Sequence, residues 1–213
     1  DEDLHFRPAI AVTSCYAGPV EDGERAVRAL RQFGTPLVDL VGPTSYVDHQ
    51  SGIDDTVPHG WHYYWKATNL TGLPDEVIDI VAEHAYQATS PRSYAAMFHL
   101  GGAVAKAPRE ATAYQGRDVE HNIIIDAAWL PDQDDAVGAV ETAWARAFLG
   151  ALQPHRAGVY VNFLDSDDDT SRVREAYGDD TYRRLAEVKA KYDPENVFHN
   201  NKNIRPGTPP LQR

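Results

Sequence analysis

Four stretches of the chain carry apolar residues at the three- and four-residue spacing that is typical of amphipathic helices. Each stretch begins at a residue that is common at a helix start. The first is followed by Gly34, and the last must end before Pro194. The predicted helices begin at Asp22, at Pro74, at Asp134 or Asp135, and at about Asp180.

Shorter apolar or alternating runs lie between these stretches and predict strands. The predicted strands are residues 8–15, 37–41, 60–67, 93–100, 121–129 and 157–163. Helices and strands are intermixed along the chain without a fixed repeat. This order predicts an α+β fold, in which a single layer of mostly antiparallel sheet has its helices packed on one face.

Side chains along a strand point alternately to the two faces of a sheet, so the strands also predict what each face offers. In residues 121–129, Ile123 and Ile125 share one side, opposite Asn122, Ile124 and Asp126. One face is therefore expected to be aliphatic, and the other to mix Tyr, Asn, Asp and His with small apolar residues. We also place Tyr64, Ala128 and Tyr160 on this second face, where they and Ile124 are candidates for contact with a partner that covers it.

The second face has two interpretations. Antiparallel sheets commonly leave one face in water, and a polar face is then only a solvated surface. Alternatively, the face is a wall against which a flat, polar ligand lies. A solvated face would normally carry more Lys, Glu and Thr, so we favour the ligand wall without excluding the solvated surface.

Composition and charge restrict the partners of the chain. Among its 213 residues, 32 are acidic and 20 basic, which gives a formal net charge of −12. A chain this acidic repels phosphate backbones and anionic lipid, so we expect neither nucleic acid nor a membrane as partner. No run approaches the ~18 apolar residues that cross a bilayer. We expect a soluble protein, favour the cytoplasm, and interpret the start at Asp1, without methionine, as a processed or truncated product.

The single cysteine and the acidic clusters do not predict a metal or disulfide site. Cys15 lies in the apolar run 8–15 and is expected to be a buried structural thiol. Asp165, Asp167 and Asp169 alternate as in a calcium loop, but Thr170 and Ala176 replace the Gly and Glu that the loop requires, which indicates a solvated acidic turn. A glycine-rich phosphate loop is also missing, so the chain alone is not expected to bind a dinucleotide.

Several motifs resemble one family, the berberine-bridge-type FAD-linked oxidases. The most specific reads Tyr-Asp-Pro-Glu-Asn-Val-Phe over residues 192–198, and it is followed by Asn-Lys-Asn-Ile-Arg-Pro over 201–206. Upstream lies the strand motif Tyr-Val-Asn-Phe, residues 160–163. Further matches extend over nearly the whole chain in the expected order: Gly18-Pro19, Tyr64-Trp65-Lys66, Gly101-Gly102-Ala103 and Thr112-Ala113.

The resemblance implies an enzyme built from two parts. In the family, an N-terminal domain binds FAD, often covalently, and a C-terminal domain lays an antiparallel sheet over the flavin with the substrate between them. The motifs of the FAD-binding domain are missing here. The resemblance therefore implies that residues 1–163 are an N-terminally truncated substrate-binding domain and residues 164–213 the terminal berberine-bridge-type segment.

The implied function is the substrate side of an FAD-dependent oxidoreductase that oxidises an alcohol, a sugar or a secondary metabolite. We expect this chain to be inactive without the FAD-binding domain. We expect that domain, or a self-association partner, to cover the second face of the sheet. The alternative is a stand-alone, flavin-free binding or oligomerisation domain derived from the family, and both readings predict the same fold.

The resemblance also implies roles for individual residues. Tyr160 matches the family tyrosine that contacts the substrate and in some members serves as the base; Asp126 is the second candidate base. Ile124, not a carboxylate, lies nearest the position where some plant members place an acidic base, and this departure favours Tyr160. The remaining candidates are Asn162, Asn201 and Asn203 for the cofactor, and Tyr64, His99, Asn122 and Ile124 for the substrate.

Overall fold

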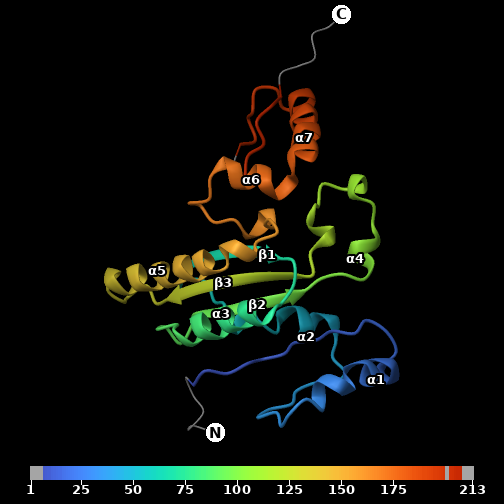
Figure 1. The fold of residues 1–213 in the computed structure, drawn as a ribbon, viewed down its shortest axis with the longest axis vertical. Coiled ribbons are helices and arrows are strands. Elements are labelled where there is room, and N and C mark those ends of the chain that lie inside the picture. Colours follow the sequence, from blue (N-terminus) through green and yellow to red (C-terminus); the bar gives the residue numbers. More distant parts are fainter. Residues whose placement is uncertain (1–6, 200–201, 208–213) are drawn as a thin grey trace, which may run out of the picture. The chain divides into compact units, whose positions relative to one another are not determined.

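A computed structural model describes residues 7–199 and 202–207 of the chain. Contacts within the chain divide it into two compact units, Asp1–His59 and Gly60–Arg213 (Figure 1). The boundary predicted at residue 163 is a different one, because it separates two functional parts that the family motifs imply. That division stays a prediction.

The described part of the first unit is helical and irregular. It contains helix α1 (Val20–Arg31), which the stripe after Asp22 predicted, the short helix α2 (Tyr46–Ser51) and a 3₁₀ turn (Asp54–Thr56). The predicted strands 8–15 and 37–41 are wrong, because neither run pairs with another strand in the described residues. Cys15 is exposed, so its predicted burial is wrong as well.

The second unit is built on a three-stranded antiparallel sheet. Strands β1 (His62–Leu70), β2 (Tyr94–His99) and β3 (His121–Trp129) lie in the order β1-β3-β2. Helices α3 (Asp75–Tyr86) and α5 (Asp135–Ala151) pack against this sheet. The α+β class is thus confirmed, as are three of the six predicted strands.

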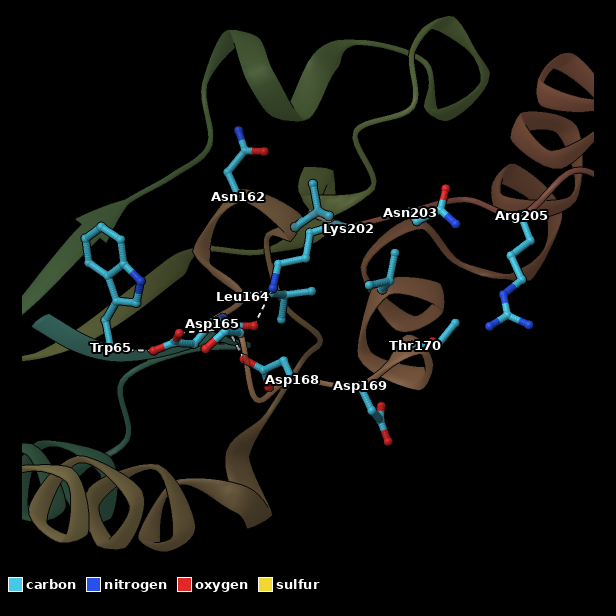
Figure 2. Close-up of a pocket in the computed structure, with 13 residues that line it drawn as sticks. Trp65, Asn162, Leu164, Asp165, Asp168, Asp169, Thr170, Lys202, Asn203 and Arg205 are labelled. Atoms are coloured by element: carbon cyan, nitrogen blue, oxygen red, sulfur yellow. Dashed lines mark hydrogen bonds between the residues drawn. The ribbon is translucent and has the colours of Figure 1, made fainter. Parts of the chain in front are cut away.

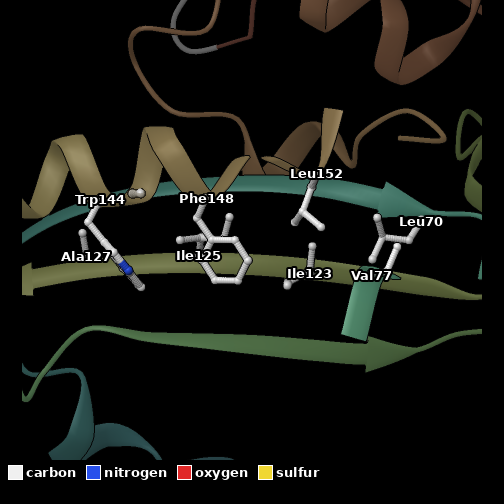
Figure 3. Packing of buried hydrophobic residues seen from close by; sticks show 9 residues of the cluster. Leu70, Val77, Ile123, Ile125, Ala127, Trp144, Phe148 and Leu152 are labelled. Atoms are coloured by element: carbon white, nitrogen blue, oxygen red, sulfur yellow. The ribbon is translucent and has the colours of Figure 1, made fainter. Parts of the chain in front are cut away.

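The main core lies between α5 and one face of the sheet. Trp144, Phe148 and Leu152 follow each other at four-residue spacing and project from α5 and its C-cap toward β3 (Figure 3). They meet Ile123 and Ile125, which alternate along β3 and are fully buried. Val77 brings α3 into the same cluster. We call this helix-covered side of the sheet the first face.

One buried carboxylate joins α5 to the segment before β2. Glu141 is fully buried, and its two oxygens accept hydrogen bonds from the hydroxyls of Thr89 and Ser93. The indole N–H of Trp144 donates to the backbone oxygen of His84 over 2.7 Å, which ties α5 to α3. These bonds satisfy polar groups that would otherwise destabilise the core.

The predicted strand 157–163 is wrong, and a glycine explains why. Asn69 exchanges two backbone hydrogen bonds with this segment, donating to Gly158 over 2.9 Å and accepting from Ala157 over 2.8 Å. Gly158 then adopts φ +100°, a conformation that L side chains rarely reach, and the chain leaves the sheet edge. Val161–Phe163 form a 3₁₀ turn instead.

After the 3₁₀ turn the chain forms two helices, α6 (Thr170–Tyr177) and α7 (Asp179–Tyr192). The latter confirms the helix predicted from about Asp180. A second, smaller core joins them to the preceding segment through Val159, Leu164, Val173 and Ala176. The short helix α4 (Ala103–Lys106) follows β2.

Candidate active site

The polar residues of interest lie on the second face of the sheet, opposite α3 and α5. Strand register defines this face, because directly paired residues of antiparallel strands point to the same side. Its members are Tyr63, Trp65, Ala67 and Asn69 of β1, Tyr94, Ala96 and Phe98 of β2, and Asn122, Ile124, Asp126 and Ala128 of β3.

Asp126 occupies the centre of this face. It is paired with Trp65 on one side and Tyr94 on the other, so the three residues form one row across the sheet. Asp126 is 0% exposed, whereas Trp65 and Tyr94 are 41% and 44% exposed. A carboxylate is thus held beneath two aromatic side chains that remain accessible.

The surroundings of Asp126 make it a stronger base than an ordinary aspartate. Burial raises its pKa to about 6, and the nearby Tyr94 hydroxyl acts in the opposite direction. Burial and the Asp126 charge raise the pKa of Tyr94 to about 12. Neither carboxylate oxygen has a hydrogen bond of regular geometry within the described structure. A buried carboxylate with a raised pKa and without regular partners is a common feature of catalytic sites.

Two of the predicted substrate-binding residues share this face, and two do not. Asn122 and Ile124 lie beside Asp126, although the Asn122 amide is engaged by donating to Asn69 Oδ1 over 2.7 Å. Tyr64 pairs with Ala127 on the first face, so its expected placement on the second face is wrong. His99 pairs with His121, also on the first face, and their rings approach to 3.3 Å.

Tyr160 lies in an aromatic cluster at the edge of the second face. Its ring meets Phe163 edge-on with centroids 5.1 Å apart, and Phe163 stacks on Phe98 of β2 at 6.1 Å. Tyr114 contacts Tyr160 from another side at 5.8 Å. Asn162 donates to the Tyr160 hydroxyl over 2.7 Å, so the 3₁₀ turn brings together two residues expected on one strand face. The two candidate bases, Tyr160 and Asp126, are not hydrogen-bonded to each other.

A polar cavity of about 730 Å³ opens beside Trp65 and the 3₁₀ turn (Figure 2). Asn162 and Asn203, both predicted to approach the cofactor, line it together with Lys202 and Arg205. Asn201 lies outside the described residues. The Lys202 ammonium donates to the backbone oxygen of Asp165, and the backbone N–H of Trp65 donates to the Asp165 carboxylate over 3.2 Å.

An ion-pair network that sequence reasoning missed holds the wall of this cavity against β1. Lys66 is buried on the first face and donates to Asp167 and Asp168. Arg146 of α5 donates to Asp167 over 2.9 Å, and Tyr64 donates to the same carboxylate over 2.8 Å. The acidic turn is therefore not merely solvated. Its clustered aspartates were the available signal, but the sequence did not indicate a partner about a hundred residues away.

These residues could face one side of a flat ring. Trp65, Tyr94 and Phe98, each more than two-fifths exposed, offer aromatic surface on the second face. Asn162 and Asn203 add amide groups that could hydrogen-bond a flavin.

Residues 7–199 and 202–207 contain no group of three or more His, Cys, Asp or Glu that could hold a metal ion. No helix in that part is long and apolar enough to cross a membrane.

Comparison with known proteins identifies the family. The family model described as "Berberine and berberine like" matches residues 159–205. An FAD-linked oxidoreductase of Dictyostelium discoideum is 32% identical over 200 residues, which cover 92% of this chain and 42% of that protein. The xylooligosaccharide oxidase of Thermothelomyces thermophilus is 27% identical over 154 residues, covering 68% of this chain and 31% of the enzyme.

A solved structure of the same kind has a similar fold. A berberine bridge enzyme variant described as a reticuline dehydrogenase superposes with a TM-score of 0.72 at 17% identity, over 90% of this chain and 45% of that one. The chain thus spans less than half the length of each of these three proteins. The matched terminal motif, the sequence relatives and the shared fold agree: the chain belongs to the berberine-bridge-like family of FAD-linked oxidoreductases.

Proposed function

We propose that this chain is the substrate side of an FAD-dependent oxidoreductase and that the substrate lies on the second face of the sheet. The observation that carries the proposal is Asp126, a wholly buried carboxylate with a pKa raised to about 6 beneath accessible aromatic side chains. Burying a charge without hydrogen-bonded partners destabilises a fold, and carboxylates with a perturbed pKa gather at functional sites.

The proposed reaction is the oxidation of an alcohol, a sugar or a secondary metabolite. FAD would supply the hydride acceptor when it is bound. The residues of this chain would bind the substrate, orient its reacting carbon and remove the proton of its hydroxyl group. Tyr160 and Asp126 are the candidate bases, and Asn122 and Ile124 are the candidates for substrate contact that lie on the second face.

Support for a sugar among these substrates comes from a relative named for oligosaccharide oxidation. The second face also offers the means to bind a sugar, because the accessible Trp65 and Tyr94 present flat apolar surface beside polar groups. The choice between a sugar and another alcohol is the part of the proposal that a substrate panel resolves.

We further propose that the FAD-binding part covers the second face and that this chain neither holds FAD tightly nor turns over by itself. The exposed Trp65, Tyr94 and Phe98 support this, since apolar surface of this kind commonly marks an interaction site. Residues 1–163 would then form the substrate-binding part and residues 164–213 the terminal segment. Stoichiometric flavin absorbance in the purified chain would contradict the proposal.

The function is tested in a protein that joins this chain to the FAD-binding part of the family. Anaerobic mixing with oligosaccharides, simple alcohols and alkaloids should reveal a substrate that bleaches the flavin absorbance. Tyr160→Phe should then slow the bleaching by ~10²–10⁴ if Tyr160 is the base. A rate within a factor of about two of the unchanged protein would show that Tyr160 is not the base. If no compound of the panel reduces the flavin of the unchanged protein, the proposed function is contradicted.

A further inference from the structure

Asp126 is fully buried, so a substrate on the second face has no direct access to its carboxylate. Tyr94 is its direct partner across the β2–β3 ladder and is accessible. We propose that Tyr94 relays a proton from the substrate hydroxyl to Asp126, so that the two residues act as one base. This inference rests on the proposed function and assigns a further residue to it.

The strand register supports the pairing. Directly opposed residues in an antiparallel ladder hold their Cβ atoms ~4.5–5.5 Å apart and point to the same side. Asp126 therefore lies between Tyr94 and Trp65 in one row across the sheet. An indole N–H can donate a proton in a hydrogen bond but has no lone pair with which to accept one, whereas a phenol can do both. Within this row, Tyr94 has the chemistry that a relay requires.

The electrostatics are consistent with a relay through a neutral phenol. With a pKa of about 12, Tyr94 stays protonated near neutral pH and is not itself the base. With a pKa of about 6, Asp126 is largely ionised there and can receive a proton. The Tyr94 hydroxyl also lowers the pKa of Asp126 against the larger effect of burial, so the two groups are electrostatically coupled.

The step balances in protons and electrons. The substrate O–H bond breaks as a new O–H bond forms on Tyr94, while the original Tyr94 proton passes to the Asp126 carboxylate. Tyr94 is neutral before and after the step, and Asp126 ends protonated. When bound, FAD would supply the acceptor for the hydride of the substrate carbon, so that the alcohol would become a carbonyl compound.

The first test needs no catalysis. The pKa of Asp126 is measured by carbon-13 NMR of this chain labelled at the aspartate carboxyl groups. Tyr94→Phe keeps the ring and removes the hydroxyl, so the Asp126 pKa should rise above about 6. Tyr86→Phe is the control, because Tyr86 lies on α3 with its side chain largely exposed and outside the second face. An unchanged Asp126 pKa in Tyr94→Phe, or an equal rise in the control, overturns the coupling.

The second test uses the protein joined to its FAD-binding part. Tyr94→Phe should slow flavin reduction by ~10² or more. In the unchanged protein, where two protons move in the step, a plot of the rate against the deuterium content of the solvent should be curved. In Tyr94→Phe the same plot should be linear. If the unchanged protein reduces flavin and Tyr94→Phe does so within a factor of about two, the relay alone is wrong. If no substrate reduces the flavin of the unchanged protein, the proposed function itself fails.

Discussion

The two faces of the three-stranded sheet come from the same three strands but differ in what they bury and what they expose. The first face buries Ile123 and Ile125 against α5, and the buried ammonium of Lys66 on this face is paired with Asp167 and Asp168. The second face buries the charge of Asp126 and keeps Trp65, Tyr94 and Phe98 exposed. The first arrangement stabilises the fold, whereas the second lowers its stability by burying a charge, a feature that is common at active sites.

The largest difference between the faces should appear when one phenylalanine is removed from each. Phe148→Ala empties a fully buried position on the first face and should lower the free energy of unfolding by ~3–5 kcal/mol. Phe98→Ala on the second face removes a ring that is 45% exposed and should cost less than about 1 kcal/mol. Urea unfolding of both variants measures the contrast. Equal losses would mean that the second face is also a packed core.

A smaller loss is expected from the buried ammonium on the first face. Lys66→Met leaves Asp167 and Asp168 without their common cation and should lower the free energy of unfolding by about 3 kcal/mol. Arg183→Met is the control, because Arg183 pairs with Asp180 and Glu187 on an exposed surface; we expect at most about 0.5 kcal/mol there. A neutral Lys66→Met would show that the network does not hold the acidic turn.

A gain in stability is expected on the second face, where the charge itself is unfavourable. Because the folded pKa of Asp126 is about 6 and its ordinary value 3.8, its contribution is fully present below pH 3.8 and is lost as the pH rises to about 6. Asp126→Asn removes that loss and should be more stable than the unchanged chain by about 3 kcal/mol at pH 7.

The same pair of proteins should have nearly the same pH dependence outside this window. Other carboxylates titrate in both, so the difference between the two stability curves isolates Asp126. Thermal unfolding between pH 3 and pH 8 records it. A difference that stays constant across pH 4–6 would show that Asp126 titrates normally and would weaken its candidacy as a base.

Much of the fold was predictable because its signals are local. The helical stripes of α1, α3, α5 and α7 and the alternation in β3 each lie within one short segment, and all five elements are present. The strand predicted over 157–163 failed because pairing depends on the backbone of Gly158, which turns the chain away from Asn69 after one exchange of hydrogen bonds. Apolar alternation does not reveal whether a partner strand is available.

The site was predictable in part for the same reason. Asp126, Asn122 and Ile124 lie on the face that alternation assigned to them, because β3 is aliphatic on its other side. Tyr64 was placed on the wrong face because β1 carries aromatic residues on both faces, so the side chains of this strand do not show which face is which. The burial of Lys66 depends on Asp167 and Asp168, which are distant in sequence and leave no local pattern.

The central claim is that the second face, and not the first, meets the substrate, and single-turnover flavin reduction tests it most directly. In the protein joined to its FAD-binding part, Asp126→Asn on the second face is compared with Tyr64→Phe on the first. We predict that Asp126→Asn slows reduction by ~10²–10⁴, whereas Tyr64→Phe changes it by less than a factor of about three. Full activity of Asp126→Asn together with a large loss in Tyr64→Phe would contradict the account.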